Sequence, residues 1–161
     1  MVDIRRYEQS DAASLEAMLT PIFRAGDTYA VDPDISPAAA STFWTAAPHE
    51  AWIAASEGEA LGSYYIQPNQ AGGGRHVCNC GFATAPAARG RGVARAMLEH
   101  SLKTAKSSGF LAMQFNFVVE TNVRAIATWE AYGFEVVGRL PKAFRHPAEG
   151  LVDALVMYKT L

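Results

Sequence analysis

The most constraining feature of the chain is a strand, a glycine- and arginine-rich turn, a helix and a second strand, which follow one another between residues 77 and 120. VCNCGFAT has strand character, an apolar stripe runs from about Arg91 to Gly109, and FLAMQFNFVVE is rich in aromatic and branched side chains. A crossover helix returns the chain in the same direction, so we expect these two strands to be parallel neighbours.

The remaining strand-like segments favour antiparallel pairing. They lie at residues 2–7, 50–56, 63–69, 135–144 and 151–161, and further helices are expected after Ser10 or Asp11, after Ser36, and after Thr121 or Asn122. The expected fold class is α/β (α+β), a mixed, mostly antiparallel sheet of six to seven strands flanked by helices. With 161 residues, 50% of them hydrophobic, the chain suits one domain over residues 1–161.

Charge and hydropathy argue against two kinds of partner. Fourteen basic and sixteen acidic residues give a net charge of -2, and no long basic run is present, so nucleic acid is not expected. No signal peptide is recognisable, and no apolar run reaches the roughly 18 residues of a membrane span. We therefore expect no membrane partner and a cytoplasmic location, and leave open whether the chain forms a homodimer.

The two cysteines, Cys78 and Cys80, lie two residues apart, so on a strand they share a face. Structural zinc sites usually need four ligands at wider spacing. Two buried thiols are the main interpretation, and a redox or metal pair is the alternative.

The turn before the central helix has the chemistry of an anion site. The first turn of a helix carries unpaired N–H groups and a positive partial charge. Glycines at 90 and 92 let the backbone approach a ligand closely, and arginines at 89, 91 and 95 supply charge. The dinucleotide fingerprint and the Walker loop do not match this segment. A phosphate-bearing cofactor is expected, and an ordinary helix start with solvated arginines is the alternative.

Two segments resemble the GNAT superfamily of N-acetyltransferases. RGRGVA is similar to its R-x-x-G-x-G/A acyl-CoA loop, and NVRAIATWEAYGFEVVG is similar to its N-x-x-A-x-x-x-[YW]-x-x-x-G-F stretch. The resemblance extends over nearly the whole chain and implies that the fourth and fifth strands diverge to leave a slot for acetyl-CoA, without a metal. The cofactor-binding residues that it implies are Phe82, Ala83, Thr84, Arg89, Gly90, Arg91, Gly92, Val93, Ala94, Asn122 and Trp129.

Trp129 departs from the pattern, because many members of the family have a tyrosine there that can protonate the departing thiolate. An indole N–H has no comparably labile proton. Trp129 is therefore either core and slot lining or a group that faces the thiolate without acting as an acid. Tyr132, at the end of the same helix, is not expected to replace the tyrosine.

Three residues are candidates for work at the reacting groups. Strand alternation places Asn79 away from the cysteines, and Asn116 repeats the situation on the next strand, so both amides are expected to be buried. They either bridge the strands by a mutual hydrogen bond or bind the substrate and order a water that takes its proton. Glu120, at the end of the fifth strand, is the best candidate for a base by position, with a solvated charge as the alternative.

The acceptor side is expected to involve Thr28, Tyr29 and Arg145, from two segments that the resemblance places beside the substrate. The implied activity is acetyl-CoA-dependent transfer of an acetyl group to the amine of a small molecule, such as an amino acid or a toxic analogue, by direct attack on the thioester. The alternatives are a non-catalytic acyl-CoA-binding or sensing module of the same fold, and acetylation of a protein or peptide amine.

Overall fold

The computed structural model describes residues 1–161 and contains seven strands, four α-helices and three short 3-10 segments. In chain order these are β1 (Asp3–Arg6), η1 (Gln9–Asp11), α1 (Ala12–Ala25), α2 (Pro37–Thr45), β2 (Glu50–Ser56), β3 (Glu59–Pro68), η2 (Gly72–Gly74), β4 (Val77–Thr84), η3 (Pro86–Ala88), α3 (Val93–Ser107), β5 (Ala112–Val119), α4 (Val123–Ala131), β6 (Glu135–His146) and β7 (Gly150–Thr160).

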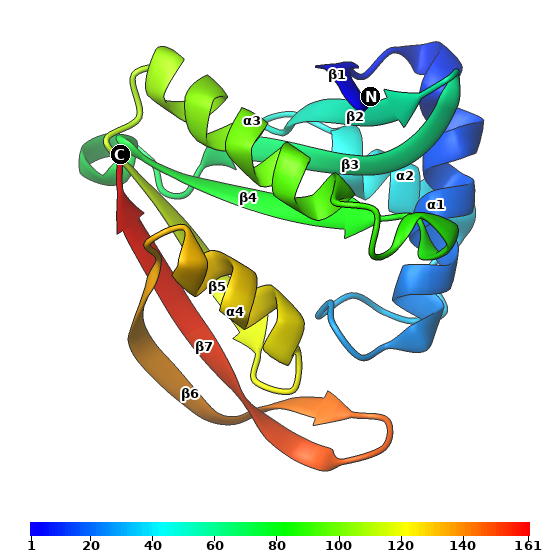
Figure 1. The fold of residues 1–161 in the computed structure, drawn as a ribbon. Helices are drawn as coiled ribbons and strands as arrows, with labels where there is room; N and C mark the ends of the chain where they lie inside the picture. The colour runs from blue at the N-terminus through cyan, green and yellow to red at the C-terminus, as the bar shows by residue number, and fades with distance from the viewer.

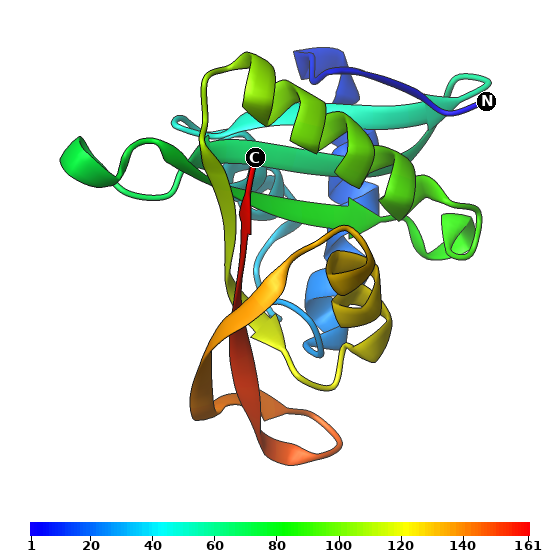
Figure 2. The same cartoon turned by 60° about the vertical axis from the view of Figure 1, so that its left-hand side comes forward.

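The strands form one sheet in the order β1-β2-β3-β4-β5-β7-β6. Every neighbouring pair is antiparallel except β4 and β5, which are parallel and joined through α3. The expected mixed, mostly antiparallel sheet is thus confirmed. The parallel pairing is short, from Val77 opposite Ala112 to Asn79 opposite Gln114, and beyond it the strands diverge into an open V (Figure 1). Turned by 60°, β5 runs steeply away from β4 (Figure 2).

The two faces of the sheet carry separate cores. α3 and α4 cover one face, where a cluster of 18 buried residues includes Met97, Met113 and Trp129. α1 and α2 cover β3 and β4 on the opposite face, where a cluster of 9 residues includes Trp44 and Tyr65. The V between β4 and β5 therefore has α3 and α4 on one side of the sheet and α1 and α2 on the other (Figure 1).

A bulge in β5 changes which side chains face each core. The register of β5 against β7 shifts between Phe115 and Val118. Phe115 belongs to the core under α3 and α4, whereas Phe117 packs with Val119 and Phe144 in a small third cluster. A bulge places an extra residue on one strand and bends it, so β5 turns away from β4 just after their pairing ends.

Several boundaries differ from the expected ones. β3 begins at Glu59, earlier than residue 63, and β6 continues to His146, because the antiparallel ladder to β7 extends to the hairpin turn. The expected apolar stripe of α3 is present, but Ala94 is exposed in the first turn. None of the helices combines the length and apolar character needed to cross a bilayer.

Met97 is the contact through which α3 rests on the sheet. Its side chain is fully buried, and its Cε atom lies 2.9 Å from the place where a Cβ would stand on Gly62 of β3. Replacing Met97 by alanine should lower the free energy of unfolding by about 2 to 5 kcal/mol, because a cavity remains. Urea denaturation measures this, with Lys103→Ala, exposed on the same helix, expected to change it by less than about 0.5 kcal/mol.

Candidate active site

Along the edge of β4 that faces the slot, only every second residue presents its backbone N–H and C=O groups. Asn69 N donates to Val77 O and Ala85 N donates to Leu61 O, which shows that the odd-numbered residues of this strand bond to β3. The backbone groups of Cys80, Phe82 and Thr84 therefore point toward β5, which has diverged. Of the expected residues Phe82, Ala83 and Thr84, the first and third present their backbone to the slot, and Ala83 bonds to β3.

Aromatic rings fill the side of the slot that faces α4. The Trp129 ring centroid lies 5.2 Å from that of Phe82 and 4.9 Å from that of Phe115, and Phe134 stacks on Phe115 at 4.4 Å. Trp129 is only 9% exposed, so it lines the slot as part of the core. The Tyr132 hydroxyl donates its proton in a hydrogen bond to Glu99 on α3, so that proton does not face the slot.

The turn into α3 leaves backbone donors and positive charge unused. Gly92 has a φ of 78°, a left-handed conformation that favours glycine, and its C=O accepts the first helical bond from Ala96 N. The N–H groups at residues 93–95 precede that bond and have no acceptor within the helix. The three arginines of the turn are exposed and none forms an ion pair; they are Arg89, Arg91 and Arg95. Together these groups can bind an anion.

Asn122 lies at the corresponding end of α4. It is the N-cap residue of that helix, and its side chain makes no capping bond, so its amide is free. The beginnings of α3 and α4 lie on the two sides of the open V (Figure 1). The structure therefore places Asn122 and the anion-binding turn on opposite arms of the V.

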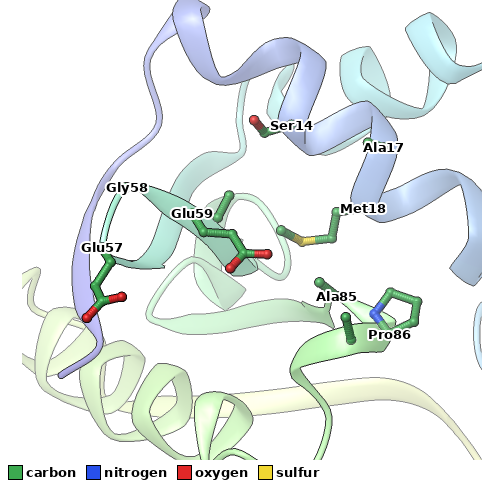
Figure 3. Close-up of a pocket in the computed structure, with 10 residues that line it drawn as sticks. Ser14, Ala17, Met18, Glu57, Gly58, Glu59, Ala85 and Pro86 are labelled. Atoms are coloured by element: carbon green, nitrogen blue, oxygen red, sulfur yellow. The ribbon is translucent and has the colours of Figure 1, made fainter.

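A pocket of about 700 Å³, separate from the slot, lies beside η3 (Figure 3). Its walls come from α1, from the turn between β2 and β3, and from the segment around Pro86. Glu57 stands on the β2–β3 turn, Glu59 begins β3, and Met18 of α1 faces Glu59 across the pocket. Two carboxylates disfavour a phosphate, so this pocket does not extend the anion-binding turn.

Tyr29 closes the face of the slot opposite α4. Its hydroxyl donates to Phe82 O at 2.5 Å, and its ring packs edge-on against Phe23 and Trp44. Burial raises the pKa of the Tyr29 hydroxyl well above its usual value, so it stays a neutral donor. Thr28 precedes it on the same loop, partly exposed and without a side-chain hydrogen bond.

Tyr65 lies on this same face and is not among the site residues predicted from the sequence. Its ring crosses Gly81, where a Cβ would lie 2.4 Å from Tyr65 Cε1 and 2.9 Å from Tyr65 Oη. His49 stacks on the ring at 3.9 Å, and Trp44 packs edge-on against it at 4.8 Å. The one available signal was a glycine in β4 opposite a tyrosine in β3, which becomes visible only with the register of the two strands.

The amide pair expected on the central strands is only half correct. Asn79 is 8% exposed; its Nδ2 donates to Gln114 O at 3.0 Å and its Oδ1 accepts from Gln67 Nε2 at 3.3 Å. Asn116 is exposed rather than buried, because it lies where β5 bends away, and it donates to Asn69 Oδ1 at 2.7 Å. The two amides share no hydrogen bond.

Glu120 and Arg145 are placed differently from the other candidates. Glu120 pairs with Arg139 at 2.9 Å, and its Oε1 accepts from Asp153 N, so a structural ion pair occupies this carboxylate. Arg139 bonds to Asp153 as well. Arg145 is exposed on β6, next to Phe144, which packs against Phe117; because strand neighbours point to opposite faces, Arg145 points away from that cluster. No hydrogen bond or ion pair joins it to Thr28 or Tyr29.

Cys78 and Cys80 are unpaired, buried thiols on the face covered by α3 and α4. This arrangement agrees with the main interpretation of the sequence. Burial raises the pKa of the Cys80 thiol well above its usual value, which keeps it protonated and unreactive.

Comparison with known proteins agrees with this geometry. Residues 13–134 match the family model of the Acetyltransferase (GNAT) family. A GCN5-related N-acetyltransferase from Kribbella flavida is 38% identical, with a TM-score of 0.94 and coverage of 99% of this chain and 98% of that one. The chain belongs to the GNAT acetyltransferase family.

Two further proteins show how far the similarity extends. N-acetyltransferase aca1 of Schizosaccharomyces pombe is 38% identical over 97 residues, which are 60% of this chain and only 46% of aca1. This chain thus matches less than half of that relative's length. A phosphinothricin acetyltransferase from Sinorhizobium meliloti, solved with AcCoA, is 20% identical with a TM-score of 0.87, covering 99% of this chain and 88% of that one, and shares the fold.

Asn79 should stabilise the point where β4 and β5 part. Asn79→Ala removes the side-chain bond to Gln114 O and leaves Gln67 Nε2 without a partner, which should lower the free energy of unfolding by about 1 to 3 kcal/mol. Asn116→Ala, on an exposed amide, should change it by less than about 0.5 kcal/mol. Urea denaturation of both variants measures the difference, and equal losses would contradict this account.

Proposed function

We propose that the chain is an acetyl-CoA-dependent N-acetyltransferase that transfers an acetyl group to the amine of a small molecule, with an amino acid or a toxic analogue as the first candidates. The observation that carries this proposal is the divergence of β4 from β5 beside a turn with unused backbone donors and three unpaired arginines. Membership of the GNAT family supports the same activity.

The residues fit the chemical parts of acetyl-CoA. Its pyrophosphate would bind the N–H groups at residues 93–95 and the arginines of the turn, where three cations have no acidic partner. The amide groups of its pantetheine arm would pair with the slot-facing N–H of Phe82 and the backbone of Thr84, as an added strand does, because Phe82 O already accepts from Tyr29. Asn122 and Trp129 would line the arm from the α4 side. The thioester supplies an activated acetyl group that an amine attacks directly.

A small acceptor is supported by the way the opposite face is closed. The bond from Tyr29 to Phe82 O ties the loop that carries Thr28 and Tyr29 to β4. This narrows the path by which an acceptor would reach the slot. The side chain of Arg145 has no partner in the protein and stays a candidate for an acceptor's carboxylate. Glu120 is a poor base while Arg139 holds it, so proton removal through an ordered water near Asn79 is the better proposal.

The rival functions keep specific support. Trp129 in place of a tyrosine is compatible with a module that binds acyl-CoA without transferring it. A peptide acceptor is also compatible with the fold, since a ribosomal-protein-alanine N-acetyltransferase from Brucella melitensis shares it with a TM-score of 0.87 at 21% identity, covering 99% of both chains. The single domain and the cytoplasmic location stay predictions, and the formation of a homodimer stays open.

Transfer is tested by the release of free CoA thiol from acetyl-CoA across a panel of amines. The panel holds amino acids, phosphinothricin, simple alkyl and aryl amines, diamines and a short alanine-headed peptide. We expect a small amine to release thiol, and calorimetry to show binding of both CoA and acetyl-CoA. Binding without release by any amine would identify the sensing module, release by the peptide alone would identify the protein acceptor, and no binding at millimolar cofactor would contradict the proposal.

The turn before α3 should determine the affinity for CoA. Arg89→Ala should weaken binding roughly tenfold to a hundredfold, the worth of one charge-assisted contact. Gly92→Glu should weaken it further, because it adds a negative charge and a side chain at a left-handed φ of 78°.

Calorimetry with CoA measures both variants. Arg75→Ala, an exposed arginine without an ion pair between β3 and β4, is the matched control and should bind normally. Unchanged affinity in a folded Gly92→Glu variant would mean that the turn is only structural.

A further inference from the structure

Two tyrosines lie on the face of the slot opposite α4, and only one of their hydroxyl groups is satisfied. Tyr29 Oη donates to Phe82 O, whereas Tyr65 Oη has no hydrogen-bond partner although the residue is only 8% exposed. The only fully enclosed unpaired side-chain atom of the protein is Trp52 Nε1, so Tyr65 Oη is reachable from solvent. Buried polar groups are normally paired, so a reachable hydroxyl beside the slot without a protein partner is available to a ligand.

The Tyr65 hydroxyl stands where the slot begins. Asn79 is the last residue of β4 paired with β5, and Gly81, two residues further, is the one that the Tyr65 ring crosses. Tyr65 Oη lies 2.9 Å from the place where a Cβ would stand on Gly81. A larger residue at this position would displace the ring, so the glycine is what brings the hydroxyl to the strand edge.

The ring is held so that the hydroxyl cannot turn away. His49 stacks on it with an interplanar angle of 3°, and His49 is itself held by a 3.2 Å contact from its Nδ1 to Trp44 O. A carbonyl can only accept, so Nδ1 carries the proton of this bond. Trp44 supports the ring edge-on and is fully buried. Such packing preorganises one polar atom against an apolar wall.

We propose that Tyr65 Oη accepts a hydrogen bond from the amine nitrogen of the acceptor and holds that nitrogen at the beginning of the slot. This inference rests on the proposed transferase function and makes Tyr65 a substrate-positioning residue. As the nitrogen bonds to the acetyl carbon it gains positive charge, and its hydrogen bond to a neutral oxygen becomes charge-assisted. The contact is therefore stronger in the transition state than in the ground state, which raises the rate more than the affinity.

The protonation state of the hydroxyl suits this role. Burial raises the pKa of Tyr65 to about 12, so near neutral pH the side chain is an uncharged phenol with free lone pairs. It accepts a hydrogen bond without taking the proton, which must leave by another route. Tyr29 differs from it in that its hydroxyl donates to Phe82 O, which ties that oxygen to the β4 backbone.

Tyr64 provides a matched control on the same strand. It points to the other face, toward α3, and its hydroxyl contacts His100 Nδ1 at 2.8 Å and lies 3.4 Å from Thr104 Oγ1. Tyr65→Phe removes an unpaired hydroxyl and should leave the melting temperature unchanged. Tyr64→Phe removes a paired one from a fully buried residue and should lower it. Only Tyr65→Phe should change the binding and turnover of the acceptor.

The experiment uses the most rapidly acetylated amine of the panel. Its affinity for the complex of the protein with CoA is measured by calorimetry, and its turnover is measured with acetyl-CoA. Tyr65→Phe should weaken acceptor affinity a few-fold and lower kcat roughly tenfold to a hundredfold, with CoA affinity unchanged. Tyr64→Phe should keep both acceptor affinity and kcat within about twofold of the unaltered protein, measured at a temperature where it is folded.

The outcomes separate this inference from the function on which it rests. Normal acceptor affinity and kcat in Tyr65→Phe, with an active unaltered protein, would overturn the role of Tyr65 alone. Weaker CoA binding in that variant would overturn it as well, because the hydroxyl would then serve the cofactor. Absence of turnover by the unaltered protein across the whole panel would contradict the proposed function and this inference together.

Discussion

The early separation of β4 from β5 is the constraint on which the rest of the structure depends. A strand that leaves its partner exposes backbone N–H and C=O groups that must find other partners. Here the separation follows the Asn79–Gln114 pair, whose side-chain bond closes the paired part, and the bulge in β5 then carries that strand away. One slot-facing carbonyl, that of Phe82, is satisfied by Tyr29, and the others remain available to an extended ligand.

The two faces of the V have different chemistry. On the α4 side Trp129 packs with Phe82 and Phe115, and the Tyr132 hydroxyl is bound to Glu99. On the opposite side the rings of Tyr29, Trp44 and Tyr65 pack together and bring hydroxyl groups to the strand edge. The hydroxyl groups of Tyr29 and Tyr65 thus lie on the face opposite α4, while the rings of Trp129, Phe82 and Phe115 form an apolar wall on the α4 side.

Most of the fold could be predicted from the sequence because its signals are local. Apolar periodicity indicated α3, alternation indicated the strands, and the strand-helix-strand passage required the parallel pair that the structure contains. The anion-binding turn was equally local, since glycines, arginines and a helix start are all contiguous. The misplaced candidates depended on distant partners. Glu120 meets Arg139 only through the β6–β7 pairing, and Asn116 is exposed because of a bulge that leaves no clear mark in the sequence.

Tyr65 shows the same limit in a form that bears on function. Tyr64 and Tyr65 are adjacent and chemically identical, yet strand alternation sends one under α3 and the other over Gly81. Only the register between β3 and β4 distinguishes a hydroxyl that stabilises the core from one that remains unpaired beside the slot. The glycine opposite Tyr65 provides the space, and the His49 and Trp44 rings fix the direction. Three segments distant in sequence therefore define one polar atom, which is why its position becomes evident only in the folded chain.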